Sequence, residues 1–555
     1  MSHRAVSDSV HWFLAELTSR IIAETGKPSD RHHVGKIMLR SLKDDPNFVL
    51  QTDGATGESE TSGSVLERSV RCASSFRNLG LQVGDVVVLM APNHLDLCIP
   101  YYASLYLGVA AATVDNTLGL AELRGTLDLD RPKIIFCQNE RISDVESVVN
   151  ELKLDTKIVT FNKGEKHINF KDFLDKYSGD TTVESFKAND FDPAETIAFL
   201  IATSGTTGLP KAAAVTHKNF YLSVFTLYLF ETNPFPGPTR LCFAVSPLQW
   251  LTSIMNFVLS AILRYPRVQT SAPLTPEHAC YIINTYKPTY AMISPTMMAT
   301  LIKPGEGTRC DFTCFERLMI SGSALLKDLV DEVKKITPNT EVTNAFGLSE
   351  TSAPCFHGGD NAPPESCGKR HLPMFVLIFL QLIDIETLQD IEEPNRPGEL
   401  WVKGPGVFKG YYKNPEATAE TFAEDGWFKT GDMLYRDENF TYYYVDRIKL
   451  LLKYKNYQIS PVEVEKVIRQ HPGVLDVAVT GIPDRECGDL PVACVVPRQG
   501  HKVTAQEIKD LVKETLSDAK QLRGGVIFLS EIPMTVTTKM HRRKLKEIAL
   551  QMKRE

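Results

Sequence analysis

The side chains best suited to chemistry in this 555-residue chain lie in one short stretch that follows a buried apolar run. Hydroxyls and two glycines fill the stretch, in the order Thr203-Ser204-Gly205-Thr206-Thr207-Gly208, and Lys211 follows. Backbone N–H groups and hydroxyls in such a loop can surround a phosphate, because glycine allows close approach without a Cβ clash. Lys211 adds a positive charge within reach of the same phosphates. A polar hairpin turn is the alternative interpretation, but the combination of hydroxyls, glycines and lysine favours anion binding.

The spacing of this stretch excludes a Walker A loop. That loop needs four residues between its glycines and a Lys-Ser/Thr pair directly after the second glycine. Here only Thr206 and Thr207 separate the glycines, and Lys211 stands three positions beyond Gly208. A P-loop kinase or GTPase is therefore a poor fit.

A second stretch with nucleotide chemistry is Asn344-Ala345-Phe346-Gly347-Leu348-Ser349-Glu350-Thr351. Phe346 can stack on a purine ring, and Gly347 lets the backbone approach that ring. Ser349 can donate to a phosphate, and Glu350 can coordinate Mg²⁺, which prefers oxygen ligands. The alternative interpretation is a helix N-terminus capped by Ser349.

Two later stretches combine carboxylates with basic residues. Asp432 follows a tight turn at Gly431 and is suited to binding two ribose hydroxyls. Arg447 offers a planar donor fork, and Lys449 and the segment Lys453–Gln458 continue the basic character. A solvated turn and a basic surface are the alternative interpretation of these stretches. Near the end of the chain, Lys539 stands in a polar segment, where a solvated surface lysine is the ordinary expectation.

These motifs, in this order and with the segment Ile532–Lys539, resemble the signatures of the adenylate-forming superfamily, which contains acyl-CoA synthetases, 4-coumarate–CoA ligases and beetle luciferases. The resemblance covers roughly residues 35 to 550. Ala212, Asn456 and Thr538 each stand where the family usually has glycine, Ser323 stands where glycine is common, and Ser246–Trp250 lacks a histidine that many members carry.

The resemblance implies an enzyme that activates a fatty or aromatic carboxylic acid as acyl-AMP and transfers it to a thiol. ATP, Mg²⁺ and coenzyme A are the implied cofactors. Catalytic roles are implied for Lys539, Lys453, Thr206 and Glu350, and metal binding for Thr206 and Glu350. The implied nucleotide- and cofactor-binding residues are Thr203, Ser204, Gly205, Thr206, Thr207, Gly208, Lys211, Asn344, Ala345, Phe346, Gly347, Ser349, Asp432, Arg447, Lys449, Lys455, Gln458 and Lys539. The implied acid-binding residues are Gln249, Trp250, Ser321, Gly322 and Ser323.

Two other hypotheses stay open. The departures at Ala212, Trp250, Asn456 and Thr538 motivate a nucleotide- or acyl-binding protein that has lost turnover. The amino-acid sequence of Tyr454–Gln458 resembles that of beetle and insect relatives. This resemblance motivates the hypothesis of a luciferase-like monooxygenase. The sequence does not indicate which acid is used.

The elements that must position these residues alternate between strand-like and helix-like segments, which predicts an α/β sheet with helices on both faces. Predicted strands include Val86–Met90, Lys133–Cys137, Phe243–Leu248 and Leu318–Ser321. A β-rich region follows Phe375. The resemblance implies a multidomain protein, with an N-terminal adenylation domain at 1–447 and a small mobile α+β lid at 448–555 that rotates near Lys449.

Composition excludes several other classes. The net charge of −7 argues against nucleic acid as the main partner, and no run reaches the roughly 18 apolar residues of a membrane span. Eleven scattered cysteines indicate reduced thiols, so we expect an intracellular and most simply cytoplasmic protein without a signal peptide. A peroxisomal location stays open as an alternative, although the chain lacks a terminal Ser-Lys-Leu. Cys355, His357 and Cys367 are expected to be unpaired side chains and not metal ligands. The sequence leaves the oligomeric state open.

Overall fold

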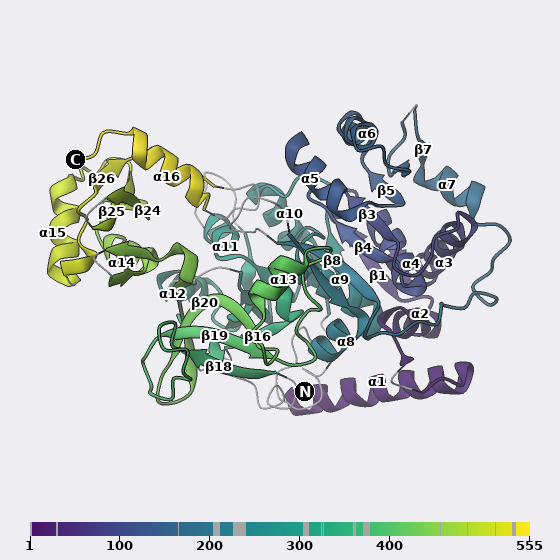
Figure 1. Ribbon diagram of the computed structural model, residues 1–555. Helices are drawn as coiled ribbons and strands as arrows, with labels where there is room; N and C mark the ends of the chain where they lie inside the picture. Colours follow the sequence, from purple (N-terminus) through teal and green to yellow (C-terminus); the bar gives the residue numbers. More distant parts are fainter. Residues whose placement is uncertain are drawn as a thin grey trace. The chain divides into compact units, whose positions relative to one another are not determined.

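The computed structural model describes residues 3–28, 31–164, 166–203, 211–225, 240–302, 310–322, 325, 327–358, 362–369, 378–454, 457–484, 487–516, 518–534 and 540–555. Figure 1 shows the helices and strands coloured along the sequence. The chain divides into two compact units. The first unit consists of Met1–Leu380 and Val402–Phe428, and the second of Gln381–Trp401 and Lys429–Glu555. The predicted domain boundary at residue 447 stays a prediction.

The first sheet of the first unit has the strand order β7-β6-β5-β3-β4-β8-β9. Its neighbouring strands are parallel, except that β8 and β9 form an antiparallel pair. The strands are β3 (Val86–Met90), β4 (Ala110–Thr113), β5 (Ile134–Cys137), β6 (Lys157–Thr160), β7 (Ile168–Asn169), β8 (Ile197–Thr203) and β9 (Lys211–Thr216). Continuous apolar runs form β3 and β5 because helices bury both faces of the sheet.

Alternate residues of these strands face opposite layers of helices. Ile135 and Leu200 pack on the side of α5 and α6, whereas Phe136 contacts Phe76 and Phe173, and Phe199 contacts Phe220. The helices around this sheet are α3 (Ser62–Asn78), α4 (Cys98–Leu107), α5 (Leu120–Asp130), α6 (Ile142–Glu151), α7 (Phe170–Tyr177) and α8 (His217–Phe225). Short 3₁₀ turns are η2 (Leu95–Leu97) and η3 (Asn139–Arg141).

The second sheet of this unit has the order β14-β13-β12-β10-β11-β1-β2, parallel except for β1 and β2. Its strands are β1 (Val49–Asp53), β2 (Ser59–Thr61), β10 (Cys242–Phe243), β11 (Arg267–Gln269), β12 (Tyr290–Ile293), β13 (Arg317–Ile320) and β14 (Glu341–Thr343). The predicted strand Phe243–Leu248 is wrong in length. β10 ends at Phe243 because the Val245 amide turns back to the Phe243 carbonyl, at 3.1 Å.

Helices α10, α11 and α12 share one apolar core with this sheet, and α2 contacts α4 and α9. The helices are α1 (His3–Thr25), α2 (Val34–Asp44), α9 (Leu251–Leu263), α10 (Pro276–Tyr286), α11 (Pro295–Ile302), α12 (Lys327–Ile336) and α13 (Pro415–Thr421). The remaining elements are η5 (Phe312–Cys314), η6 (Ser349–Thr351) and the strands β15 (Ala345–Gly347), β16 (Pro354–His357) and β17 (Gly368–Lys369).

The second unit contains strands in the order β21-β20-β19-β18 and a further sheet, β23-β22-β25-β24, with β26 on β25. Helices α14 and α15 pack on one face of the further sheet and α16 on the other. The elements are β18 (Phe379–Ile383), β19 (Gly398–Lys403), β20 (Phe428–Arg436), β21 (Thr441–Arg447), η8 (Ile448–Leu450), β22 (Leu452–Tyr454), β23 (Tyr457–Ile459), α14 (Pro461–Ile468), β24 (Val474–Asp484), β25 (Gly488–Pro497), α15 (Ala505–Thr515), η9 (Asp518–Lys520), β26 (Gly525–Phe528) and α16 (Arg542–Gln551). The predicted α/β fold with a β-rich part and a small α+β part is confirmed.

Candidate active site

Strands β8 and β9 position the ends of the predicted phosphate loop. They form a hairpin in which Thr203 faces Lys211 and Ala202 faces Ala212. The Thr203 hydroxyl donates to the Lys211 carbonyl at 3.4 Å. The loop residues Ser204, Gly205, Thr206, Thr207 and Gly208 lie outside the described residues. The pair of β8 and β9 at the edge of the first sheet therefore places Thr203 and Lys211 opposite each other at the two ends of the loop.

Ala212, which replaces the family's usual glycine, fits its surroundings. Its side chain is 6% exposed and belongs to the apolar core shared by the first sheet with α5 and α6. Its carbonyl accepts a hydrogen bond from the Tyr412 amide at 2.8 Å. The methyl group therefore adds buried apolar surface and meets no steric obstacle.

Tyr411 connects Lys211 with Glu350. The Tyr411 hydroxyl donates to Oε1 of Glu350 at 2.9 Å, and the Lys211 ammonium lies over the Tyr411 ring, 5.1 Å from its centroid. All three residues belong to the first unit. Lys211, which follows the first predicted loop, and Glu350 of the second predicted motif, far apart in the sequence, therefore contact the same side chain.

Backbone hydrogen bonds of the short segment 408–412 hold this arrangement in place. Tyr411 forms an isolated antiparallel bridge with Ala213 of β9, and the Ala214 amide donates to the Gly410 carbonyl at 2.9 Å. The Phe408 amide donates to the Glu350 carbonyl at 2.7 Å. The segment 408–412 thus joins β9 to η6. Tyr411 is not among the residues predicted from the sequence. The adjacent Gly410, which has a φ of +135°, is the sequence signal for a special backbone position here.

The surroundings of Glu350 fit a bound cation. Its side chain is buried, with 8% exposure, and the ion pairs found among the described residues do not include it. A buried carboxylate without a positive partner is costly, and Mg²⁺ favours carboxylate oxygen. Thr206, the other predicted ligand, lies outside the described residues. Within the described chain, no group of three or more His, Cys, Asp or Glu side chains could hold a metal ion.

The turns expected to bind the acid meet at one edge of the second sheet. β10, β12, β13 and β14 are parallel neighbours, so the turns after their carboxyl ends share that edge. Ser321 follows β13, and its hydroxyl donates to the Ala345 carbonyl at 2.6 Å. Gln249 and Trp250 are half-buried, and Trp250 precedes the first residue of α9. Gly322 follows Ser321, whereas Ser323 lies outside the described residues.

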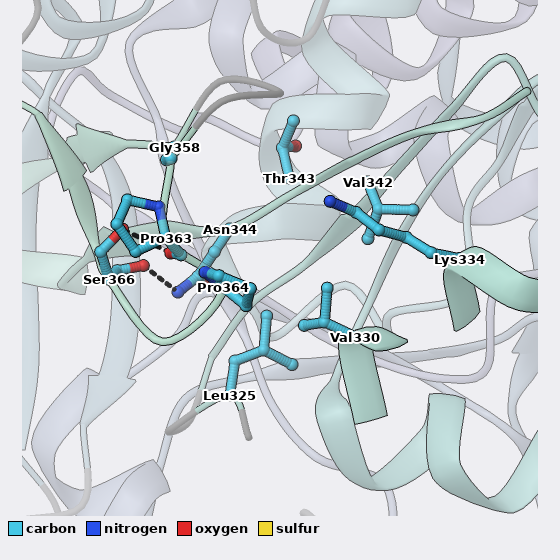
Figure 2. Close-up of a pocket in the computed structure, with 11 residues that line it drawn as sticks. Leu325, Val330, Lys334, Val342, Thr343, Asn344, Gly358, Pro363, Pro364 and Ser366 are labelled. Atoms are coloured by element: carbon cyan, nitrogen blue, oxygen red, sulfur yellow. Dashed lines mark hydrogen bonds between the residues drawn. The ribbon is translucent and has the colours of Figure 1, made fainter. Parts of the chain in front are cut away.

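Asn344 and Gly347 have structural roles that their sequence motif did not predict. The Asn344 side-chain amide donates to the Ser366 carbonyl at 2.9 Å, beside a small cavity between α12, β14 and residues 362–366 (Figure 2). A Cβ at Gly347 would lie 2.8 Å from Cα of Pro354, so glycine permits β15 to pair with β16. The interpretation of Ser349 as a helix cap is wrong, because Leu348 precedes a single 3₁₀ turn that starts at Ser349.

Phe346 keeps the exposure that a stacking residue needs. Its ring is half-buried, and its centroid lies 5.9 Å from that of Phe356. Packing against a neighbouring ring fixes one side of Phe346, which suits it to bind a planar group.

In the second unit, Asp432 and Arg447 form an ion pair. They face each other across β20 and β21, and Nε of Arg447 donates to Oδ1 of Asp432 at 3.0 Å. The Asp432 side chain is 3% exposed, whereas that of Arg447 is 41% exposed. Gly431 has a φ of +70°, which glycine adopts without strain, and its amide donates to Glu399 at 2.9 Å. The two predicted ribose-binding side chains are therefore adjacent.

Asp446 fixes the junction between β21 and α14. Its carboxylate accepts hydrogen bonds from the Arg447 amide at 2.7 Å and from the Ser460 hydroxyl at 3.1 Å. Burial raises the pKa of Asp446, and Arg542 opposes that shift. Burial also raises the pKa of Tyr444, with Asp432 and Asp446 adding to the effect.

The predicted thiol-side segment forms a hairpin. Lys449 is exposed on η8, and Lys453 on β22 faces Gln458 on β23. Lys455 and Asn456 lie outside the described residues, as do the side chains of Lys453 and Gln458.

Lys539 also lies outside the described residues, but its flanks are placed. Met534 and Met540 form an isolated bridge, and the His541 amide donates to the Pro533 carbonyl at 2.8 Å. Arg542, the first residue of α16, lies 3.5 Å from Oε1 of the buried Glu465. The segment that carries Lys539 therefore starts and ends at one anchored point of the second unit.

Comparisons with known proteins show which family this chain resembles. A profile of the AMP-binding enzyme family matches residues 25–412, and a profile of the AMP-binding enzyme C-terminal domain matches residues 463–539. The luciferin 4-monooxygenase of Photuris pensylvanica is 33% identical over 523 residues, covering 92% of this chain and 93% of that protein. The 4-coumarate–CoA ligase 4 of Arabidopsis thaliana is 30% identical over 526 residues, covering 90% and 88%. The solved structure of ATP-bound MatB from Rhodopseudomonas palustris has a TM-score of 0.82 at 22% identity, covering 94% of this chain and 99% of that chain.

Proposed function

The chain belongs to the AMP-binding enzyme family, and we propose that it is an ATP-dependent ligase that joins a carboxylic acid to the thiol of coenzyme A. One observation carries the proposal. Tyr411 links Lys211 and Glu350, so the ends of two motifs suited to phosphate and metal binding meet in one unit. The 30% identity to a plant 4-coumarate–CoA ligase supports the thiol acceptor.

In the first half-reaction, a carboxylate oxygen of the acid attacks the α-phosphorus of ATP. The bond from that phosphorus to the bridging oxygen of pyrophosphate breaks, which gives acyl-AMP and pyrophosphate. Thr203–Gly208 and Lys211 would hold the phosphates, and Asp432 with Arg447 would hold the ribose. Lys539 would orient the carboxylate and the α-phosphate. Such positioning and charge stabilisation supply most of the catalysis expected for phosphoryl-group chemistry.

Magnesium, when bound, would neutralise charge on the phosphate oxygens, and Thr206 and Glu350 are the residues that would hold it. Phe346 would stack on the adenine, with Asn344, Ala345, Gly347 and Ser349 shaping that side of the nucleotide site. The acid would bind among Gln249, Trp250, Ser321, Gly322 and Ser323.

In the second half-reaction, the thiol sulfur attacks the acyl carbon of acyl-AMP. The acyl–oxygen bond to AMP breaks, the thiol proton is lost to solvent or a base, and AMP leaves with the electron pair. We propose that the C-terminal lid moves between the two steps, withdrawing Lys539 and bringing Lys453, Lys455 and Gln458 to the thiol. Lid movements of this kind often limit turnover.

We also propose an intracellular location. All eleven cysteines are free thiols, which supports a reducing compartment. Among the described residues, no helix has both the length and the apolar character needed to cross a membrane.

The first test is acid-dependent exchange of pyrophosphate into ATP, measured with fatty and aromatic acids of graded length. We expect exchange with at least one acid class, since Lys539 positions both reacting groups. Lys539→Ala should abolish that exchange and leave thioester formation from supplied acyl-AMP largely intact. Lys544→Ala, at an exposed position of α16, is the matched control and should keep both activities.

Two outcomes would contradict the proposal. Equal loss of both half-reactions in Lys539→Ala would remove the role given to that lysine. Complete absence of acid-dependent exchange would favour the hypothesis of a nucleotide- or acyl-binding protein without turnover.

A luciferase-like oxygenase is the second candidate, favoured by the 33% identity to the Photuris protein. Luciferin oxidation begins with the same adenylation but consumes O₂ in place of a thiol. Light emission and oxygen consumption with luciferin and ATP distinguish it from the ligase. We expect thioester formation with coenzyme A and little or no light.

A further inference from the structure

Tyr411 contacts both of the charged side chains that the proposed function places at the phosphates and the metal. Its hydroxyl donates to Oε1 of Glu350 at 2.9 Å, and its ring faces the Lys211 ammonium at 5.1 Å. We propose that Tyr411 is a positioning residue that keeps Glu350 and Lys211 apart and oriented. Glu350 can then bind the metal, and Lys211 can bind the phosphates. This inference rests on the function proposed above and adds a residue to its machinery.

The hydroxyl of Tyr411 fixes the rotation of the Glu350 carboxylate. A hydrogen bond at Oε1 directs the other oxygen of the carboxylate toward a different ligand. Carboxylates that bind metals are commonly oriented by such outer hydrogen bonds, and loss of the bond weakens metal binding. Glu350 is buried, and its backbone is held by the Phe408 amide at 2.7 Å, so the remaining freedom is that of the side chain.

The ring of Tyr411 gives Lys211 an attractive neighbour that is not a carboxylate. A lysine ammonium over an aromatic face is stabilised by the ring quadrupole. A direct ion pair between Lys211 and Glu350 would neutralise both groups, and the ion pairs of the described residues do not include one. The ring therefore leaves each charge available to an added ligand.

Contacts of its backbone and its ring, besides the hydroxyl, hold Tyr411 in position. It pairs with Ala213, its amide donates to the Thr418 hydroxyl at 2.9 Å, and its ring contacts Phe408 with centroids 5.0 Å apart. Tyr411→Phe removes only the hydroxyl and keeps these contacts. We therefore expect the variant to fold normally.

Manganese is a suitable probe, since it shares the preference of Mg²⁺ for oxygen ligands and has an electron paramagnetic resonance signal. Mn²⁺ is titrated into the protein saturated with α,β-methylene-ATP, and free Mn²⁺ is measured. Tyr411→Phe should weaken Mn²⁺ binding roughly 10-fold, because the carboxylate loses its orienting bond. Binding of the nucleotide in the presence of a chelator should be unchanged in this variant. Tyr411→Leu should weaken both, because it also removes the ring beneath Lys211.

Tyr412→Phe is the matched control, since it removes a hydroxyl from the next residue, and it should bind Mn²⁺ like the unsubstituted protein. Unchanged Mn²⁺ binding in Tyr411→Phe overturns the proposal. An equal loss in Tyr412→Phe also overturns it, because the effect would then be general to the segment. If Tyr411→Phe selectively weakens Mn²⁺ binding but no acid supports pyrophosphate exchange, the positioning role stands and the ligase function fails.

Discussion

At the scale of single residues, His217 is the least expected side chain of the first unit. It is fully buried at the start of α8, and neither ring nitrogen has a hydrogen-bond partner among the described residues. Its ring lies 5.3 Å from that of His33 and 4.9 Å from that of Phe191. Burial lowers the pKa of His217 to about 3, and burial also lowers the pKa of His33. Burial therefore favours the neutral form of both imidazoles in the folded chain.

This burial predicts a loss of stability in acid. A folded pKa below the ordinary value means that the unfolded chain binds more protons, so stability is complete above about pH 6.5 and falls as the pH drops toward 3. At pH 5 the loss from His217 should be about 2 kcal/mol. His217→Phe keeps an aromatic ring but has no titrating nitrogen, so it should remove that part of the loss. Denaturant unfolding of both proteins at pH 8 and pH 5 measures this difference in unfolding free energy.

His501→Phe, at an exposed position, is the control and should leave the pH dependence of unfolding as it is. If His217→Phe shows the same difference between pH 8 and pH 5 as the unsubstituted protein, the acid sensitivity has another source.

At the scale of elements, the hairpin of β8 and β9 carries the predicted phosphate loop and contributes to the core. Ala212 and Ala214 both point into the cluster shared with α5 and α6, at 6% and 4% exposure. Side chains alternate along a strand, so Ala213 between them faces the other way, and its backbone bridges to Tyr411. One strand thus serves the core and the site through different residues.

This arrangement predicts the effect of restoring the family's glycine. Ala212→Gly should reduce the unfolding free energy by roughly 1 to 2 kcal/mol. The folded protein loses a buried methyl group, and the unfolded chain gains conformational entropy at the glycine. It should not raise the rate of pyrophosphate exchange, since the methyl lies in the core. Chemical denaturation and the exchange assay check the two expectations. Ala214→Gly is the matched control with a similar loss of stability, and a large gain of activity in Ala212→Gly alone would show that Ala212 impairs the site.

At the scale of the whole molecule, each unit has its own apolar core. In the first unit, Ile135 belongs to the cluster of the first sheet, and in the second unit, Ile468 belongs to the cluster around α14 and α15. Units with separate cores can unfold separately, in which case one midpoint does not describe the protein.

We therefore expect differential scanning calorimetry to resolve more than one transition. Ile468→Ala should reduce the unfolding free energy of the second unit by about 2 to 5 kcal/mol. It should therefore lower the transition temperature of that unit and leave the transition temperature of the first unit unchanged. Ile135→Ala, a substitution of the same size in the first unit, should have the converse effect. A single transition that moves equally in both variants would mean that the two units unfold as one.

The sequence by itself determined the family, the α/β class and the order of the motifs. These features depend on local chemistry: apolar runs become buried strands, and glycines and hydroxyls mark the turns after them. The strands β3, β5 and β13 were predicted within a residue of their observed bounds, because β3 and β5 are uninterrupted apolar runs and β13 contains one after Arg317.

Only the tertiary structure decided which side chains act on one another. Tyr411 reaches Glu350 across 61 residues of chain, and no local pattern records such a contact. Gly347 is needed because Pro354 approaches it, and Asn344 is used to hold the Ser366 loop, although the motif suggested a nucleotide contact for both. The physical reason is that periodicity describes one element at a time, whereas hydrogen bonds and steric contacts between elements exist only once the strands have paired.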